Sequence, residues 1–98
     1  VKGYKKLRGS SKQLLKTLAK MRELIAIQRD LPKRWIIKDE YLIHLSERYA
    51  KRNSKLYEDY AITSYNENLQ ERMIQTIEKF WERGADLPDN DQDGDNEA

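Results

Sequence analysis

The chain has 98 residues, of which 38% are hydrophobic and 37% are charged, so it holds enough apolar material for one small core and little more. It contains no cysteine, which excludes disulfides and thiolate metal sites, and no apolar run approaches the roughly 20 residues that a membrane helix needs. These features predict a cytoplasmic protein without a membrane partner, and because the first residue is Val rather than Met, we expect a segment of a longer protein.

The formal net charge of +2 combines two regions of opposite sign. Six of the 17 acids lie between Asp86 and Ala98, where there is no base, which leaves 11 acids against 19 bases in residues 1–85. A basic body favours binding to a polyanion such as nucleic acid, although a merely soluble helical surface has the same composition.

The first predicted element is a long amphipathic helix that follows an extended lead-in over residues 1–9. Ser10 or Ser11 is a suitable N-cap for it. A core-facing stripe then recurs at helical spacing and comprises Leu14, Leu18, Met21 and Ile25, widened by Leu15 and Leu24. Lys12, Lys16 and Lys20 recur every fourth residue and form a basic face that points away from this stripe.

The segment after Arg29 is expected to break this helix, because Pro32 disfavours helical geometry at the residue before it. Trp35, Ile36 and Ile37 form the only compact apolar run in the chain. We interpret this run as a buried loop in which Trp35 fills a space in the core.

Three further helices are predicted. Asp39 is expected to cap the second helix, whose apolar face comprises Leu42, Leu45 and Tyr49. Asn53 or Ser54 should cap a short third helix, whose expected buried positions are Leu56, Tyr57, Tyr60 and Ala61. Ser64 to Glu67 match a Ser-x-x-Glu capping box before the fourth helix, which should end at Gly84 and bury Leu69, Met73, Ile77 and Phe80, with Ile74 and Trp81 widening that face.

The predicted fold class is therefore all-α, a compact bundle of four to five short helices over residues 10–84. Residues 1–9 would form a linker. Residues 85–98 would form a disordered acidic tail, since they contain too little apolar surface to pack.

The residue types that commonly act in catalysis do not form a recognisable catalytic pattern in this chain. His44 is the only histidine, and a lone histidine is more often a structural or surface residue than a catalyst. A zinc site needs three or four ligands, and neither a glycine-rich phosphate loop nor a nucleophile motif is present. Asp89, Asp91 and Asp93 match half of a calcium-binding loop, but a solvated acidic linker explains them better. We expect no catalytic residue, no metal ligand and no cofactor.

Several segments together resemble one known family. They are residues 1–3 with Leu7, residues 21–23 (Met-Arg-Glu), residues 29–32 (Arg-Asp-Leu-Pro), residues 35–42 (Trp-Ile-Ile-Lys-Asp-Glu-Tyr-Leu), and Ser54 with Leu56. In this order and spacing they resemble the HRDC domain (helicase and RNase D C-terminal), in the version found in bacterial ribonuclease D. That resemblance implies a helical accessory domain that binds RNA, such as tRNA precursors, or single-stranded nucleic acid. It also implies an upstream 3′–5′ exonuclease domain as a partner, which would hold the divalent metals.

Two functions remain open from the sequence. In the first, the domain binds RNA phosphates through basic residues of the central loop and the end of the second helix: Lys33, Arg34, Lys38, Arg48, Lys51 and Arg52. Lys12, Lys16 and Lys20 are a second possible face for this role. In the second, the domain is a structural or protein-interaction module that docks on its own catalytic domain or on a partner, and the acidic tail shields the basic face.

Overall fold

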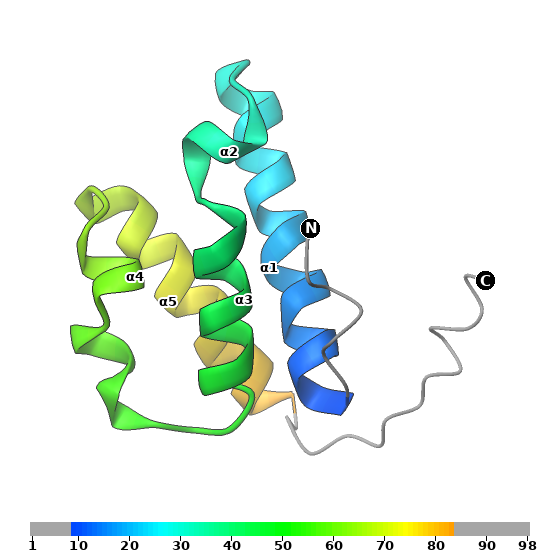
Figure 1. The fold of residues 1–98 in the computed structure, drawn as a ribbon, viewed down its shortest axis with the longest axis vertical. Helices are drawn as coiled ribbons and strands as arrows, with labels where there is room; N and C mark the ends of the chain where they lie inside the picture. The colour runs from blue at the N-terminus through cyan, green and yellow to red at the C-terminus, as the bar shows by residue number, and fades with distance from the viewer. Residues whose placement is uncertain (1–8, 84–98) are drawn as a thin grey trace.

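The computed structural model describes residues 9–83, which form five α-helices and one 3₁₀ helix without a strand (Figure 1). In chain order these elements are α1 (Gly9–Arg29), α2 (Lys33–Ile36), α3 (Asp39–Arg48), η2 (Ser54–Glu58), α4 (Tyr60–Thr63) and α5 (Glu67–Glu82). The predicted all-α bundle is confirmed. Gly9 belongs to α1 and not to the predicted linker over residues 1–9, so α1 begins before Ser10 and Ser11, the predicted caps. Residues 1–8 of that linker, the stop at Gly84 and the acidic tail over 85–98 lie outside the described residues.

The core is built around α1, which packs against α2, α3 and α5. Figure 1 shows α3 running back antiparallel to α1, as short connections favour. The helical spacing of the apolar residues correctly predicts most of the core, including Leu14 and Leu18 of α1, Leu42 and Leu45 of α3, and Met73 and Ile77 of α5. Full burial of one such side chain contributes about 1.5–3 kcal/mol.

The end of α1 is set by a turn at Asp30, before Pro32 is reached. Asp30 has φ 59°, a left-handed conformation that asparagine and aspartate tolerate better than most residues. The amide of Leu31 donates to the carbonyl of Ala26 at 3.0 Å, and the amide of Asp30 donates to that of Ile27 at 3.2 Å. These two bonds form a Schellman motif, which satisfies helix carbonyls that would otherwise lack a partner.

The expected buried role of Trp35 is wrong. Lys33–Ile36 form one helical turn, α2, in place of a loop, and Trp35 is 64% exposed. Ile36 and Ile37 are buried as predicted. Successive residues of a helix point about 100° apart, so the turn that directs Ile36 into the core directs Trp35 towards solvent.

A buried arginine holds the corner between α1, α2 and α3. The Arg22 guanidinium donates to the Ile37 carbonyl at 2.8 Å and to the Asp39 carboxylate at 2.7 Å. The N-cap of α3 is therefore Lys38, one residue before the predicted Asp39, whose carboxylate binds Arg22. The charged pair ties the first turn of α3 to α1 across 17 positions of sequence.

Three smaller predictions are also corrected. Asn66 caps α5 by accepting from the amide of Leu69, so Ser64 does not start a capping box. Leu56 and Ala61 are buried as predicted, but Tyr57 and Tyr60 are exposed, because the segment divides into η2 and the short α4. Leu24 is half exposed at the edge of the stripe on α1. Asn53 caps η2 as expected.

Candidate nucleic-acid interface

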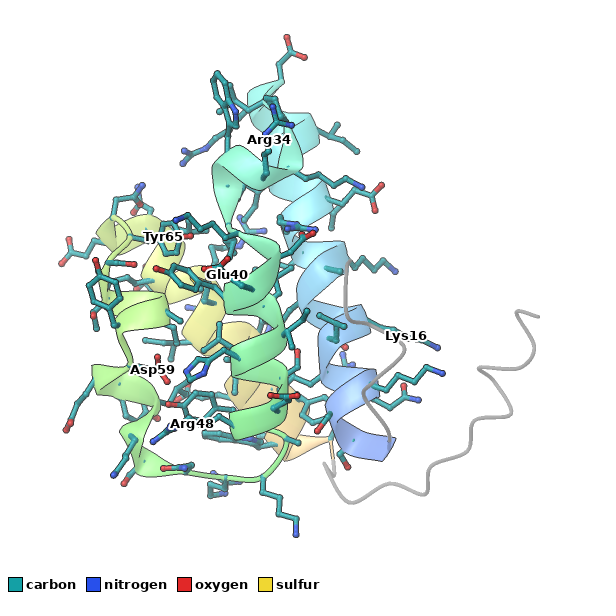
Figure 2. The ribbon with its side chains drawn as sticks, viewed as in Figure 1. Lys16, Arg34, Glu40, Arg48, Asp59 and Tyr65 are labelled. Atoms are coloured by element: carbon teal, nitrogen blue, oxygen red, sulfur yellow. The ribbon has the colours of Figure 1, made fainter. Side chains whose placement is uncertain are left out.

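The six predicted phosphate-binding residues are all exposed, but they form two separate groups (Figure 2). We call Lys33, Arg34 and Lys38 the upper cluster, and Arg48, Lys51 and Arg52 the lower cluster. Lys38 precedes the first residue of α3 and Arg48 is its last, so about 15 Å of helix separates the two clusters. In Figure 2, Arg34 and Arg48 accordingly lie at opposite ends of the molecule.

The upper cluster surrounds the exposed indole of Trp35. Lys33 and Arg34 belong to the same turn, α2, and Lys38 follows three residues after Trp35. None of the three cations forms an ion pair with another residue of the described segment 9–83. Together with Lys38, the turn therefore presents an exposed indole and three cations that have no ion-pair partner within residues 9–83.

Two tyrosines contact Lys38, one through its ring and one through its hydroxyl. The Lys38 ammonium lies 5.6 Å from the centre of the Tyr41 ring, a cation–π distance, and the Lys38 amide donates to the Tyr65 hydroxyl at 3.3 Å. The two rings meet edge to face at 6.0 Å. Burial raises the pKa of Tyr65, so its hydroxyl stays neutral at physiological pH.

The charge of the upper surface is mixed. Asp30 and Lys33 line the same shallow depression beside α2, together with Glu23. Glu40 lies two residues after Lys38 in the first turn of α3. These carboxylates moderate the positive potential around Trp35, so the indole is the feature that distinguishes this surface from other exposed basic segments.

The lower cluster is partly engaged within the protein. The Arg48 side chain lies 4.0 Å from the Asp59 carboxylate, and the Arg52 guanidinium lies 5.3 Å from the centre of the buried Trp81 ring. The Trp81 indole in turn donates to the Tyr49 carbonyl at 2.8 Å. These contacts give two of the three cations a structural role.

Asp59 forms a polar cluster that the sequence did not predict. Its carboxylate accepts from the Tyr49 hydroxyl at 2.5 Å, contacts the His44 ring nitrogen at 2.9 Å, and caps α4 by accepting from the amide of Ala61 at 3.0 Å. An aspartate directly before a short apolar helix is the N-cap signal that could have identified it. The expectation that His44 is structural agrees with this pairing.

The charge state of Asp59 follows from these contacts. Burial alone would raise the pKa of its carboxyl, but hydrogen bonds from Tyr49, His44 and the Ala61 amide together hold that pKa below the ordinary value. Burial, followed by the bond to Asp59, raises the pKa of Tyr49. The cluster is thus an ionised carboxylate held by several hydrogen-bond donors, which is a stable structural arrangement.

The second predicted face, on α1, is less uniform than its spacing suggests. Lys20 is exposed, whereas Lys12 and Lys16 are partly buried. In Figure 2, Lys16 projects from α1 on the side away from α3. This face therefore lies on a different side of the bundle from the two clusters.

Trp35 is the main functional candidate that the sequence reasoning missed. The signal was Pro32, because proline is favoured at the start of a helix as well as after its end. Pro32 occupies the N-cap position of α2. Taking Pro32 as a helix start would have placed Ile36 and Trp35 on different faces.

Within residues 9–83, no group of three or more His, Asp or Glu side chains is placed to hold a metal ion. None of the helices in the same segment is long and apolar enough to cross a membrane.

Comparison with known families gives one match. The model of the HRDC domain matches residues 11–59, which is half of the chain and includes both clusters and Trp35. Searches of curated proteins and of solved structures gave no match. HRDC domains are non-catalytic accessory domains that commonly bind nucleic acid.

Proposed function

This chain belongs to the HRDC domain family, and on that premise we propose that it is an accessory domain that binds single-stranded nucleic acid through Trp35 and the upper cluster. The observation that carries this proposal is the 64% exposure of Trp35. A folded domain gains stability by burying an indole, so an exposed one surrounded by cations favours a binding role.

The proposed contact has two components. Stacking of a base on an aromatic side chain is worth about 1–3 kcal/mol and tolerates any base. Lys33, Arg34 and Lys38 would contact the flanking phosphates, which adds affinity that falls with salt. Both contacts need unpaired bases or a flexible backbone, so a single strand fits this surface better than a duplex.

At a finer level, we propose that the domain serves a ribonuclease D-like 3′–5′ exoribonuclease that trims RNA 3′ ends, such as those of tRNA precursors. The support is the resemblance of residues 21–23, 29–32 and 35–42 to that version of the family. The exonuclease domain, with its divalent metals, would lie upstream. The present domain would raise the local concentration of the RNA near that active site.

The test compares two exposed aromatic residues. Fluorescence anisotropy of a labelled single-stranded RNA would be measured with the natural chain, with Trp35→Ala and with Tyr60→Ala. Tyr60 is a matched control because it is 69% exposed but follows Asp59 and lies on α4. Loss of stacking predicts that Trp35→Ala weakens binding about 5- to 150-fold, whereas Tyr60→Ala leaves it within about twofold.

Equal affinity of the Trp35→Ala chain and the natural chain would contradict the proposal. Thermal unfolding of both variants serves as the control for folding. Both substitutions remove exposed side chains, so neither should lower stability by more than about 0.5 kcal/mol.

A second function, docking on a protein domain, is favoured by another observation. Leu24, Ile27 and Leu31 are all exposed and recur at helical spacing along the outer side of the second half of α1 and its cap. Such an apolar stripe is typical of a surface that contacts another protein. Ile27→Glu should then weaken association with the upstream domain in the longer protein and leave RNA binding by this chain unchanged.

A further inference from the structure

A basic groove runs between α1 and α5 on a surface that neither cluster occupies. It has a volume of about 320 Å³ and is bordered by Lys20 of α1 and by Arg72, Lys79 and Arg83 of α5 and its C-cap. No acidic side chain is among the described residues that line it. Within residues 9–83, none of these four cations has an ion-pair partner.

The floor of the same groove is apolar. Met21 is buried, Phe80 is partly buried and Leu24 is 49% exposed, and all three contribute to the lining. Exposed leucine in the middle of a basic rim fits a ligand that has one apolar side chain between negative charges. Neutral polar side chains, Thr17 and Gln75 among them, complete the wall.

We propose that this groove binds residues 86–93 of the same chain, with Leu87 on the apolar floor and Asp86, Asp89 and Asp91 against the basic rim. The sequence supplies the complementary pattern, since Leu87 is the only large apolar residue between Asp86 and Ala98. The inference stands on the groove and on this segment, and does not depend on the proposed function.

The length of the connection permits this contact. Arg83 borders the groove, and Leu87 follows it by four residues, which span up to about 14 Å when extended. The groove follows α5 from Arg72 to Arg83, about 16 Å of helix. Gly84 directly follows Arg83 in the sequence, and a glycine there would permit the backbone angles that folding back along α5 requires.

A short tether also makes weak affinity sufficient. The effective concentration of a segment joined by a few flexible residues is of the order of millimolar. A dissociation constant of about 1 mM between separate molecules would therefore keep the segment bound for half of the time or more.

Nucleic acid fits this groove less well than the acidic segment. Phe80, the aromatic residue in the lining, is partly buried and leaves no free ring face comparable to that of Trp35. An apolar floor would contact the charged backbone of a nucleic acid without a favourable partner. Binding of RNA at this groove is nevertheless an outcome that the experiment distinguishes.

The absence of cysteine permits a specific test in the full chain. A nitroxide would be attached to the thiol introduced by Gln92→Cys, and amide signal loss would be measured by NMR without nucleic acid. The proposal predicts that amides around Lys20, Leu24, Gln75 and Lys79 lose most of their intensity relative to the reduced label. Amides of α2 and of η2 should keep theirs.

The control variants separate charge from apolar contact. Arg72→Glu with Lys79→Glu should restore the groove signals by reversing the rim charge, and Leu87→Ser should restore them while keeping all four acids of residues 86–93. Raising the salt to 1 M, where the screening length is about 3 Å, should weaken the loss. The control Lys51→Glu with Lys55→Glu changes two cations that do not line the groove, and it should leave the loss unchanged.

Signal loss that is absent, uniform over the domain, or unaffected by Arg72→Glu with Lys79→Glu would overturn the proposal. It would also be overturned if that variant, in a separate titration, lost RNA affinity as strongly as removal of the upper cluster, because the groove would then be a nucleic-acid surface. Failure of RNA binding by the natural chain would affect the proposed function alone.

Discussion

The upper and lower clusters, at the two ends of α3, both consist of basic residues, but these residues make different contacts at each end. Each end has three exposed cations and one tryptophan. At the upper end the tryptophan is exposed and the cations lack ion-pair partners within residues 9–83. At the lower end Trp81 is buried, Arg52 lies against its ring, and Arg48 faces Asp59.

We infer from this difference that the partners of a cation decide its role, because both ends carry three exposed cations. A guanidinium that already covers an indole or faces a carboxylate would give up that contact to bind phosphate. In the upper cluster, Lys33 and Arg34 have no ion-pair partner within residues 9–83, and the Lys38 ammonium lies over the Tyr41 ring without a carboxylate partner in that segment. We therefore expect the lower end to contribute mainly to stability and the upper end mainly to binding.

The largest expected effect is on stability at the lower end. Asp59→Ala removes a mostly buried carboxylate, the cap of α4, and the acceptor of Tyr49 and His44. Loss of these bonds should lower the free energy of unfolding by about 2–4 kcal/mol, as measured by urea denaturation. A loss below about 0.5 kcal/mol would show that the Asp59 cluster does not hold the lower end together.

The next effect compares the two clusters directly. Replacing Lys33, Arg34 and Lys38 by alanine should weaken RNA binding about tenfold or more at low salt. It should also reduce the slope of log affinity against log salt by about 2, since each phosphate contact to a single strand contributes about 0.7. The matched replacement of Arg48, Lys51 and Arg52 should change affinity less than about threefold.

The order of the two triple variants should reverse for stability: replacing the lower cluster should lower the free energy of unfolding more than replacing the upper cluster. Loss of the Arg52–Trp81 and Arg48–Asp59 contacts should cost about 1 kcal/mol, measured by denaturation. Equal affinity losses for the two triple variants would mean that one continuous surface binds the RNA, and the distinction between the ends would then be wrong.

A smaller effect is expected at the cap of α1. Asp30→Gly should raise the free energy of unfolding by about 0.5–1 kcal/mol, because φ 59° costs glycine less than aspartate. Removing this acid beside Lys33 should also strengthen RNA binding slightly. Asp30→Asn should give the gain in affinity with little gain in stability, so a stability gain of the same size from both variants would contradict this account of the turn.

The smallest effect concerns pH. The folded-state pKa of Asp59 is lower than its value in the unfolded chain, which is about 3.9. Its contribution to stability is therefore complete above that value and is lost as the pH falls through the folded-state pKa. The difference in unfolding free energy between the natural chain and Asp59→Asn should shrink between pH 5 and strongly acidic solution, and a constant difference would contradict the hydrogen-bond pattern.

The sequence predicts the core well and the surface poorly, for physical reasons. Leu14, Leu18, Leu42 and Ile77 follow helical spacing, and burial rewards that spacing wherever the helices pack. Trp35, Tyr57 and Tyr60 were expected inside because they are apolar. Their exposure depends on three short elements, α2, η2 and α4, which are too short to show a periodic pattern in the sequence.

The six candidate cations illustrate the same limit. Their types and exposure follow from composition, but their division into two clusters depends on the length of α3. Their pairing depends on Asp59 and Trp81, which lie 11 and 33 positions after Arg48. Tertiary contacts over such separations cannot be inferred from local residue patterns.

The most direct test of the central claim is the fluorescence of Trp35 during titration with a single-stranded RNA. The chain has two tryptophans, and Trp81 is only 7% exposed, so Trp35→Phe supplies a chain that reports Trp81 alone. Stacking of a base on Trp35 predicts saturable quenching in the natural chain at the RNA concentrations where anisotropy shows binding, and none in Trp35→Phe. Binding without quenching of Trp35, or equal quenching in both chains, would contradict the account.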